Sequence, residues 1–412
     1  NLNAINMESM FQGCSSLTSL NLTNFNCTEL INISKMFYGC KSLIYLNFDN
    51  FITYKIINMD SLFYGCNSLQ SVDLSHLNTN YLVNINRMFY NCYSLSYLDL
   101  GNFNTELIKD MSYLFYGCIS LTTLELGMFN TSNVENFEYM FYECKLLISL
   151  NLSNFDTINA TNMEYMFSYC ISLQNIQLNN FNTKNVKSMA GMFQNCSNIS
   201  SLDLTNFNIQ EVDSLDYMFK GCTSLDLLNI SNFLSFKNVS VREMFYDCIS
   251  LKFINFSNFN LTFSNNISGM FYNCQSISSL NIINYNTEFV KDMSYLFYNC
   301  NQLKKLDLSY FITDNVIKMN SMLYNCSSLI SLNLSNFNTT NVQDMNKMFM
   351  NCKLLDFLDL SNFETNNVYN MEYVFDSCIK LTSIVLDFYY FNTSNVINMQ
   401  SMFRNCRELK EL

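Results

Sequence analysis

The sequence predicts an α/β solenoid, a right-handed superhelix with one parallel sheet and short helical turns, built from about 16 coils of 26 residues. Three observations predict this fold. A cysteine recurs every 26 residues from Cys14 to Cys378, leucines alternate with polar residues after each cysteine, and an apolar group at helical spacing precedes the next one. Because one such unit cannot bury its apolar face alone, neighbouring units are expected to stack.

Each predicted coil begins with a short strand. In one coil, for example, Leu332 and Leu334 flank the polar Asn333. Alternation of apolar and polar residues with a period of two is the pattern of a half-buried strand. The strands of successive coils are therefore expected to lie side by side in a parallel sheet.

An asparagine-rich turn follows each strand. Proline is absent and only 9 glycines are present, so the turns are expected to depend on Asn, Asp, Ser and Thr side chains that bond to the nearby backbone. A spine of phenylalanines lies three residues after the last strand leucine, at Phe25, Phe51, Phe103, Phe155, Phe181, Phe337 and Phe363. The asparagine before each of them could bond the backbone of adjacent turns, at Asn24, Asn50, Asn102, Asn154, Asn180, Asn336 and Asn362.

Each coil ends in an apolar group that includes the recurring cysteine. In one coil this group consists of Met345, Met348, Phe349 and Cys352. The spacing i, i+3, i+4 and i+7 places all four side chains on one face of a short helix or helical turn. Each coil is thus expected to contain one strand, one turn rich in asparagine and one helical turn.

Composition excludes several classes of function. The chain has 412 residues and a net charge of -12 without a basic stripe, which argues against a nucleic-acid binder. No apolar run of about 18 residues could span a bilayer. The first residues contain neither an initiator Met nor the apolar region of a signal peptide, so a mature or trimmed product is expected. We expect a single solenoid domain over residues 1–412 without recognisable caps.

The repeat motif carries a family resemblance. Residues 36–47 read MFYGCKSLIYLN, and residues 326–352 repeat the pattern with the turn SNFNTTNV. This pattern resembles the BspA-like group of leucine-rich-repeat surface proteins over essentially the whole chain. The resemblance implies a leucine-rich-repeat fold, and it implies an extracellular or cell-surface location with an adhesive or host-contact role.

The cysteines are expected to be reduced thiols that pack as small hydrophobic side chains in a ladder. Parallel Cβ vectors on adjacent coils suit a disulfide poorly, although some pairing, such as one that involves Cys27, stays open. Cys-x-x-Cys pairs are absent and the only histidine, His76, replaces a turn asparagine, so no metal or cofactor site is expected. The ladder comprises Cys14, Cys40, Cys66, Cys92, Cys118, Cys144, Cys170, Cys196, Cys222, Cys248, Cys274, Cys300, Cys326, Cys352, Cys378 and Cys406.

Two strips of side chains are candidate interaction surfaces. The outward strand positions, which include Asp73, Asp99 and Glu125, form either a solvated sheet face or an oxygen-rich site for calcium or sugar hydroxyls. Tyrosines form a second strip, which is either a contact surface for another chain or a glycan, or a stack that shields the core. Its members are Tyr38, Tyr64, Tyr90, Tyr116 and Tyr142, and later Tyr246, Tyr272, Tyr298 and Tyr324.

Irregular segments and sequons add further candidates. The turn pattern weakens over residues 206–267, and two residues are inserted before Phe391, which is expected to expose Phe388, Tyr389 and Tyr390. Sequons of the form Asn-x-Ser/Thr are candidate N-glycosylation sites if the chain is secreted. They include Asn21, Asn26, Asn130, Asn151, Asn229, Asn255, Asn333 and Asn392.

These observations favour a non-enzymatic extracellular or cell-surface protein with an adhesive or structural role, whose partners are other protein chains or glycans. No acid, base, nucleophile or phosphate loop is assembled, so catalysis is not expected. Two alternatives stay open. Both ends are interpreted as open coils, so the chain is either a fragment or a subunit that stacks end to end in an extracellular filament. Reduced cysteines and a missing signal peptide also fit an intracellular interaction scaffold.

Overall fold

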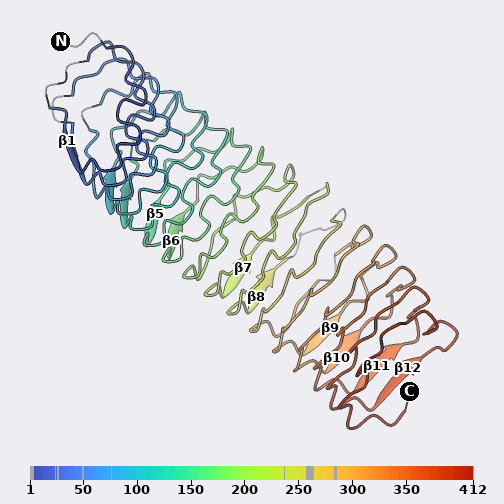
Figure 1. The fold of residues 1–412 in the computed structure, drawn as a ribbon. Coiled ribbons are helices and arrows are strands. Elements are labelled where there is room, and N and C mark those ends of the chain that lie inside the picture. The colour runs from blue at the N-terminus through green and yellow to red at the C-terminus, as the bar shows by residue number, and fades with distance from the viewer. Residues whose placement is uncertain are drawn as a thin grey trace. The chain divides into compact units, whose positions relative to one another are not determined.

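The computed structural model describes residues 4–23, 25, 27–48, 51–75, 77–127, 129–235, 237–256, 264–282 and 285–411. It divides into two compact units, Asn1–Ile199 and Ser200–Leu412. Both units consist of stacked coils of parallel backbone, and within each unit the strands lie on the same side of the coils (Figure 1). The described residues form a repeat of about 14 turns, and the count of about 16 coils stays a prediction.

The predicted parallel strands are present, but they are short and paired two by two. Unit 1 contains β1 (Ser19–Asn21), β2 (Tyr45–Asn47), β3 (Tyr97–Asp99), β4 (Thr123–Glu125), β5 (Ser149–Asn151) and β6 (Asn175–Gln177). Unit 2 contains β7 (Leu227–Asn229), β8 (Phe253–Asn255), β9 (Lys305–Asp307), β10 (Ser331–Asn333), β11 (Phe357–Leu360) and β12 (Ser383–Leu386).

Each strand pairs in parallel with one neighbour, and the register aligns equivalent repeat positions. In β3 and β4, for example, Leu98 lies opposite Leu124 and Asp99 opposite Glu125. The pairs are β1 with β2, β3 with β4, β5 with β6, β7 with β8, β9 with β10, and β11 with β12. The expectation of one continuous sheet is therefore wrong over the described residues, because coils such as Ser71 to Asp73 contribute no strand between two pairs.

The predicted short helical turns are not confirmed. Over the described residues the structure contains no helix. It therefore has no helix there that is long and apolar enough to cross a bilayer. The segment around Met348 is instead a run of β-turns, in which the Met348 N–H donates to Met345 O at 3.1 Å. The next N–H, of Phe349, donates at 2.9 Å to Val374 in the following coil, a bond that a helix could not make.

Positive φ angles explain how these turns form. Lys347 and Asn351 have φ of 56° and 64°, the left-handed conformation that the third position of a type II turn requires. The turns direct every second N–H toward the next coil and still bury the apolar group, with Met345 3% and Met348 0% exposed. A run of turns and a helix can therefore bury the same apolar side chains. The backbone hydrogen bonds between coils favour the turns.

The core consists of columns of equivalent side chains. In unit 1, the rings of Phe115, Phe141 and Phe167 are stacked at centroid distances of 5.5 Å. The predicted phenylalanine spine is also present, since the rings of Phe155 and Phe181 are stacked at 6.4 Å. Burial of these large apolar side chains is the main stabilising contribution.

Polar side chains link the turns of neighbouring coils. The Asn154 amide donates to Gly127 O at 2.9 Å, as the turn asparagines were expected to do. Asn24 and Asn50, two of the other predicted positions, lie outside the described residues. A threonine column was not predicted: the Thr157 hydroxyl donates to Asn182 O at 3.0 Å and accepts from Asn182 N at 2.7 Å.

Candidate binding site on the strand face

Three consecutive coils of unit 1 carry an acidic residue at the outward strand position. These residues are Asp73, Asp99 and Glu125, and all three side chains are exposed. Asp99 Oδ1 accepts from Gly101 N at 2.7 Å, and Asp73 Oδ1 accepts from Ser75 N at 2.9 Å. One oxygen of each aspartate therefore stabilises the turn that follows its strand position.

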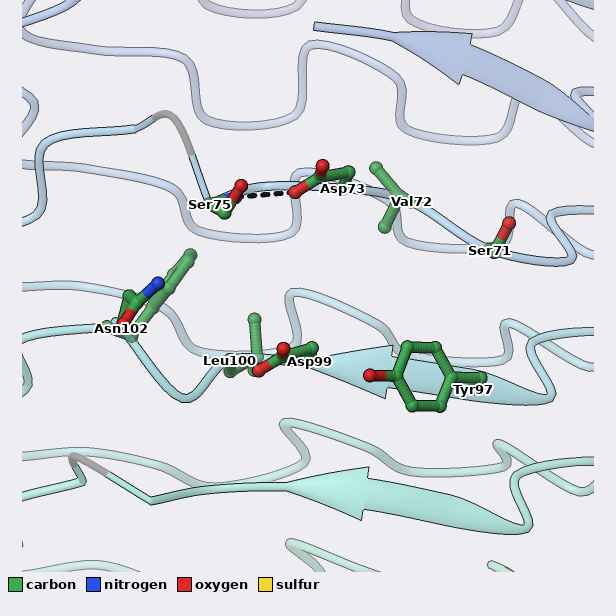
Figure 2. A pocket seen from close by; sticks show the side chains of 9 residues that line it. Ser71, Val72, Asp73, Ser75, Tyr97, Asp99, Leu100 and Asn102 are labelled. Carbon is green, nitrogen blue, oxygen red and sulfur yellow. Dashed lines mark hydrogen bonds between the residues drawn. The ribbon is translucent and has the colours of Figure 1, made fainter. Parts of the chain in front are cut away.

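A hollow of about 410 Å³ lies between the coils of Asp73 and Asp99. Figure 2 shows that Asp73 and Ser75 come from one coil, whereas Tyr97 and Asp99 come from β3 in the next. The full lining consists of Ser71, Val72, Asp73, Ser75, Tyr97, Asp99, Leu100, Asn102 and Phe103. The hollow therefore combines an apolar floor with an acidic, hydroxyl-bearing and aromatic rim. This is the usual composition of a ligand site.

Smaller core residues lie where this hollow forms. Val72 occupies the inward strand position where β3 has Leu98, and Leu77 occupies the spine position where the next coil has Phe103. Both losses of volume fall in one coil, and this coil forms no strand. The hollow was not predicted, and the two smaller side chains are the signal in the sequence that indicates it.

The charge of the hollow limits what it can bind. Its lining includes two carboxylates and no Lys or Arg, so an anionic ligand would meet only repulsion. Over the described residues no group of three or more His, Cys, Asp or Glu side chains is placed to hold a metal ion. The arrangement therefore suits a neutral polar or a cationic group that offers hydrogen-bond donors.

The predicted tyrosine strip forms a continuous stack. In unit 1 the rings of Tyr38, Tyr64, Tyr90, Tyr116 and Tyr142 lie 4.4 to 4.6 Å apart and nearly parallel. Partial burial raises the pKa of Tyr64 to about 12. Because each ring covers the face of the next, only ring edges and hydroxyls remain for a partner.

A second tyrosine column was not predicted. Tyr113, Tyr139 and Tyr165 stack at 5.1 and 4.9 Å beside the first column. The Arg87 guanidinium lies over the Tyr113 ring at 4.8 Å, which is a cation–π contact. All four tyrosines that continue the first strip in unit 2 also stack, at 4.1 to 4.4 Å: Tyr246, Tyr272, Tyr298 and Tyr324.

The two-residue insertion in unit 2 exposes its aromatic side chains. Phe388, Tyr389 and Tyr390 are 71%, 83% and 44% exposed. Tyr389 and Tyr390 contact each other edge to face at 5.1 Å. Over the described residues no other aromatic side chain is as exposed as Tyr389, so this group stays a candidate contact surface.

The candidate glycosylation sites lie mostly on exposed backbone. Asn151, Asn229 and Asn333 are exposed at strand ends, and each Oδ1 accepts the N–H two residues later at 3.0 to 3.1 Å. Exposed sequons also include Asn21, Asn130 and Asn392, and Asn255 is half-buried. Asn26 and His76 lie outside the described residues. Use of these sequons stays a prediction.

Most of the recurring cysteines are buried free thiols in equivalent environments. The Cys118 thiol donates to Phe89 O at 3.2 Å, and the Cys144 thiol donates to Phe115 O at 3.4 Å. Cys27 is free and buried as well, whereas Cys14 is exposed and Cys406 is half-buried. Burial raises the pKa of Cys170 to about 12. Such thiols are poor nucleophiles and metal ligands at neutral pH.

Comparison with protein families decides where the chain belongs. The family described as "Mycoplasma protein of unknown function, DUF285" matches residues 5–121, 92–202, 144–259, 239–355 and 330–411. The chain belongs to this family. Its recognition as a BspA-like leucine-rich-repeat protein is confirmed as well. No curated protein matches this DUF285 member.

Solved structures to which this chain is similar include three from bacteria. A leucine-rich cell surface protein from Faecalibacterium prausnitzii is 18% identical, with 78% of this chain and 80% of that chain covered and a TM-score of 0.44. A leucine-rich-repeat protein from Bacteroides ovatus is 15% identical, with 99% and 88% covered and a TM-score of 0.36. The functional domain of InlJ from Listeria monocytogenes, described as including a cysteine ladder, is 15% identical, with 90% and 68% covered and a TM-score of 0.24.

Proposed function

We propose that this DUF285 member is a non-enzymatic adhesive protein of the cell surface or extracellular space, which binds its partner through the strand face of unit 1. The observation that carries the proposal is the hollow between the coils of Asp73 and Asp99, with Tyr97 on its rim. It is open, acidic and aromatic, and its floor is apolar. These are properties of a recognition site on a rigid scaffold.

Binding fits this site better than catalysis. A hydrolytic or transfer site needs a nucleophile or base whose reactive atom is positioned by a second group. Here one oxygen of each aspartate accepts from a backbone N–H of its own turn, so that bond stabilises the turn and does not position a reacting group. The cysteines are proposed to act as a structural ladder only, since their thiols are bonded to core carbonyls.

The proposal predicts a loss of adhesion when the hollow is altered. Replacing Tyr97 by Ala together with Asp73→Ala is expected to reduce binding of the full chain to a target cell surface at least about tenfold, because aromatic and charged side chains at the centre of an interface carry most of its energy. The measurement is binding of labelled protein to intact cells.

Asp307→Ala is the matched control. Asp307 is also an exposed strand-end aspartate, and its Oδ1 accepts from Ser309 N at 3.0 Å, but it belongs to unit 2 and lines no part of the hollow. Equal loss of adhesion in both variants would show that the hollow is not the site. Equal adhesion of the wild type and the Tyr97 variant would lead to the same conclusion.

A second candidate function is end-to-end stacking into a filament. Apolar side chains are exposed on the first and last described coils: Ile5 and Met10 are 57% and 51% exposed, and Ile397 and Met399 are 85% and 43% exposed. Exposed apolar groups of this kind favour association. If they drive assembly, Leu409→Asp is expected to abolish concentration-dependent polymers in analytical ultracentrifugation. A monomeric wild type at high concentration would exclude this function.

A further inference from the structure

A second hollow adjoins the first on unit 1. It has a volume of about 450 Å³ and lies between residues 51–54 of one coil and residues 77–80 of the next. Asn102 lines both hollows. The two hollows therefore adjoin at Asn102, and together they are called the depression, which spans three consecutive coils.

A buried hydroxyl without a partner lies on the wall of this second hollow. Thr53 is 2% exposed, and its Oγ1 makes no hydrogen bond. In other coils the equivalent hydroxyl bonds to the coil that follows: Thr105 donates to Asn130 O at 2.9 Å, and Thr157 donates to Asn182 O at 3.0 Å. A buried polar group left unbonded costs about 1–3 kcal/mol, so Thr53 is a site where stability has been lost.

The lost bond follows from a change in the core. The residue that would accept from Thr53 is Asn78, next to Leu77. Leu77 replaces a ring of the phenylalanine spine, whereas Phe51 and Phe103 retain it in the coils on either side. Because leucine fills less space than phenylalanine, the Thr53 coil and the Leu77 coil do not meet at this edge. The second hollow occupies the space between them.

The walls of the second hollow offer neutral hydrogen-bonding groups. Amides come from Asn78, Asn80 and Asn102, and no Lys, Arg, Asp or Glu lines it. One exposed ring borders each hollow, since Tyr54 and Tyr97 are 52% and 49% exposed. Unlike the stacked tyrosine column, these two rings retain a face that can be covered by a ligand.

This combination matches the chemistry of a carbohydrate. Sugar hydroxyls both donate and accept, so they pair with amides, carboxylates and a threonine hydroxyl alike. The C–H faces of a sugar pack against aromatic rings, which have one apolar face and one polar end. An anionic ligand would find no cation in either hollow, and an apolar peptide side chain would leave the amides unbonded.

We infer that the depression binds a neutral oligosaccharide, with one sugar unit in the amide hollow bonded to Thr53, and the next unit beside Tyr97 and Asp99. Because no hydrogen bond holds the Thr53 rotamer, rotation about its Cα–Cβ bond can turn the hydroxyl toward the ligand without breaking a bond. The inference rests on the proposed function, since it names the partner class for the strand face.

The test uses the full chain and a panel of neutral trisaccharides built from glucose, galactose, mannose or N-acetylglucosamine. Binding is measured by titration calorimetry and by saturation transfer to ligand protons. At least one trisaccharide is expected to bind the wild type. Thr53→Val is expected to weaken that binding about tenfold, because the ligand loses a buried hydrogen bond.

Thr157→Val is the matched control for this variant. It removes a hydroxyl that is bonded in the unliganded protein, so it is expected to lower the unfolding free energy and to leave sugar affinity unchanged. Thr53→Val removes a hydroxyl that is unbonded, so it is expected to leave stability unchanged or to raise it. Thr53→Val is thus expected to change sugar affinity but not to lower stability, and Thr157→Val the reverse. This difference distinguishes a ligand contact from a structural one.

A further variant fills the second hollow. Leu77→Phe restores the spine ring and is expected to abolish trisaccharide binding in a protein that remains folded by circular dichroism. The inference is overturned if no trisaccharide binds, if binding survives both Thr53→Val and Leu77→Phe, or if only a basic peptide binds the depression. Cell adhesion of the wild type, measured on the same preparation, separates the two claims. Wild-type adhesion without binding of any trisaccharide overturns the carbohydrate inference alone, and absence of both from the wild type overturns the proposed function as well.

Discussion

Alkaline solution is expected to unfold the protein cooperatively between about pH 9 and pH 12. Burial raises the pKa of Cys170 and Cys300 from 9.0 to about 12, and that of Cys40 to about 11. The folded state therefore keeps these thiols protonated over a pH range in which the unfolded chain releases their protons. Their contribution to stability is complete below pH 9 and is lost as the pH rises toward 12.

The expected effect is large because the thiols recur. One pH unit corresponds to about 1.4 kcal/mol for each buried thiol, so each loses about 2 kcal/mol by about pH 10.5. Three such thiols would offset about 6 kcal/mol, which is comparable to the whole stability of an ordinary domain. Circular dichroism during a pH titration with reductant present measures the midpoint.

Cys170→Ala provides the control for the alkaline transition. This variant is expected to be less stable at neutral pH because it leaves a small cavity, and its unfolding is expected to release one proton fewer. A protein that keeps its full dichroism at about pH 12 would contradict the assignment of buried neutral thiols. Unchanged proton release in Cys170→Ala would contradict it as well.

Phe141→Ala is expected to lower the unfolding free energy by about 3–5 kcal/mol. The Phe141 ring is completely buried and stacks on Phe115 and Phe167 at 5.5 Å on either side. Its removal leaves a cavity in contact with three coils, and in a stacked repeat each coil is stabilised mainly by its neighbours. Urea unfolding of the full chain measures the loss.

Tyr142→Ala is the neighbouring control. Tyr142 is half-buried and belongs to the outer tyrosine column, so its truncation is expected to cost less than about half as much. Equal losses in the two variants would show that the columns contribute equally to the core. A loss below about 1 kcal/mol for Phe141→Ala would show that the phenylalanine column is not the main stabilising element.

The spacing of apolar residues predicted much of the coil. Leu98 and Leu124 occupy the inward strand positions that the alternation required, and the Asn154 amide bonds to the neighbouring coil as its turn position required. The helical turn was not confirmed, and the reason is physical. The spacing of Met345, Met348 and Phe349 determines which side chains are buried, but not whether the backbone is helical. A run of β-turns buries the same three side chains, and its backbone N–H groups also bond to the next coil.

The candidate site was harder to predict because it arises from small differences in volume. Val72 and Leu77 are as apolar as the residues they replace, so a pattern of apolar and polar positions does not distinguish them. They coincide in the coil that lines both hollows and that follows the unbonded Thr53 hydroxyl. The sequence likewise left the role of the tyrosine strip open. The 26-residue spacing shows that the rings align, but it does not show that each ring covers the face of the next.

The measurement that tests the binding assignment most directly is hydrogen–deuterium exchange of the full chain, alone and bound to envelope fragments of the cells to which it adheres. Slower exchange is expected in residues 51–54, 71–75, 77–80 and 97–103, with little change at the Tyr116 and Tyr142 column. Protection confined to that column or to residues 388–390, with none around the two hollows, would contradict the assignment.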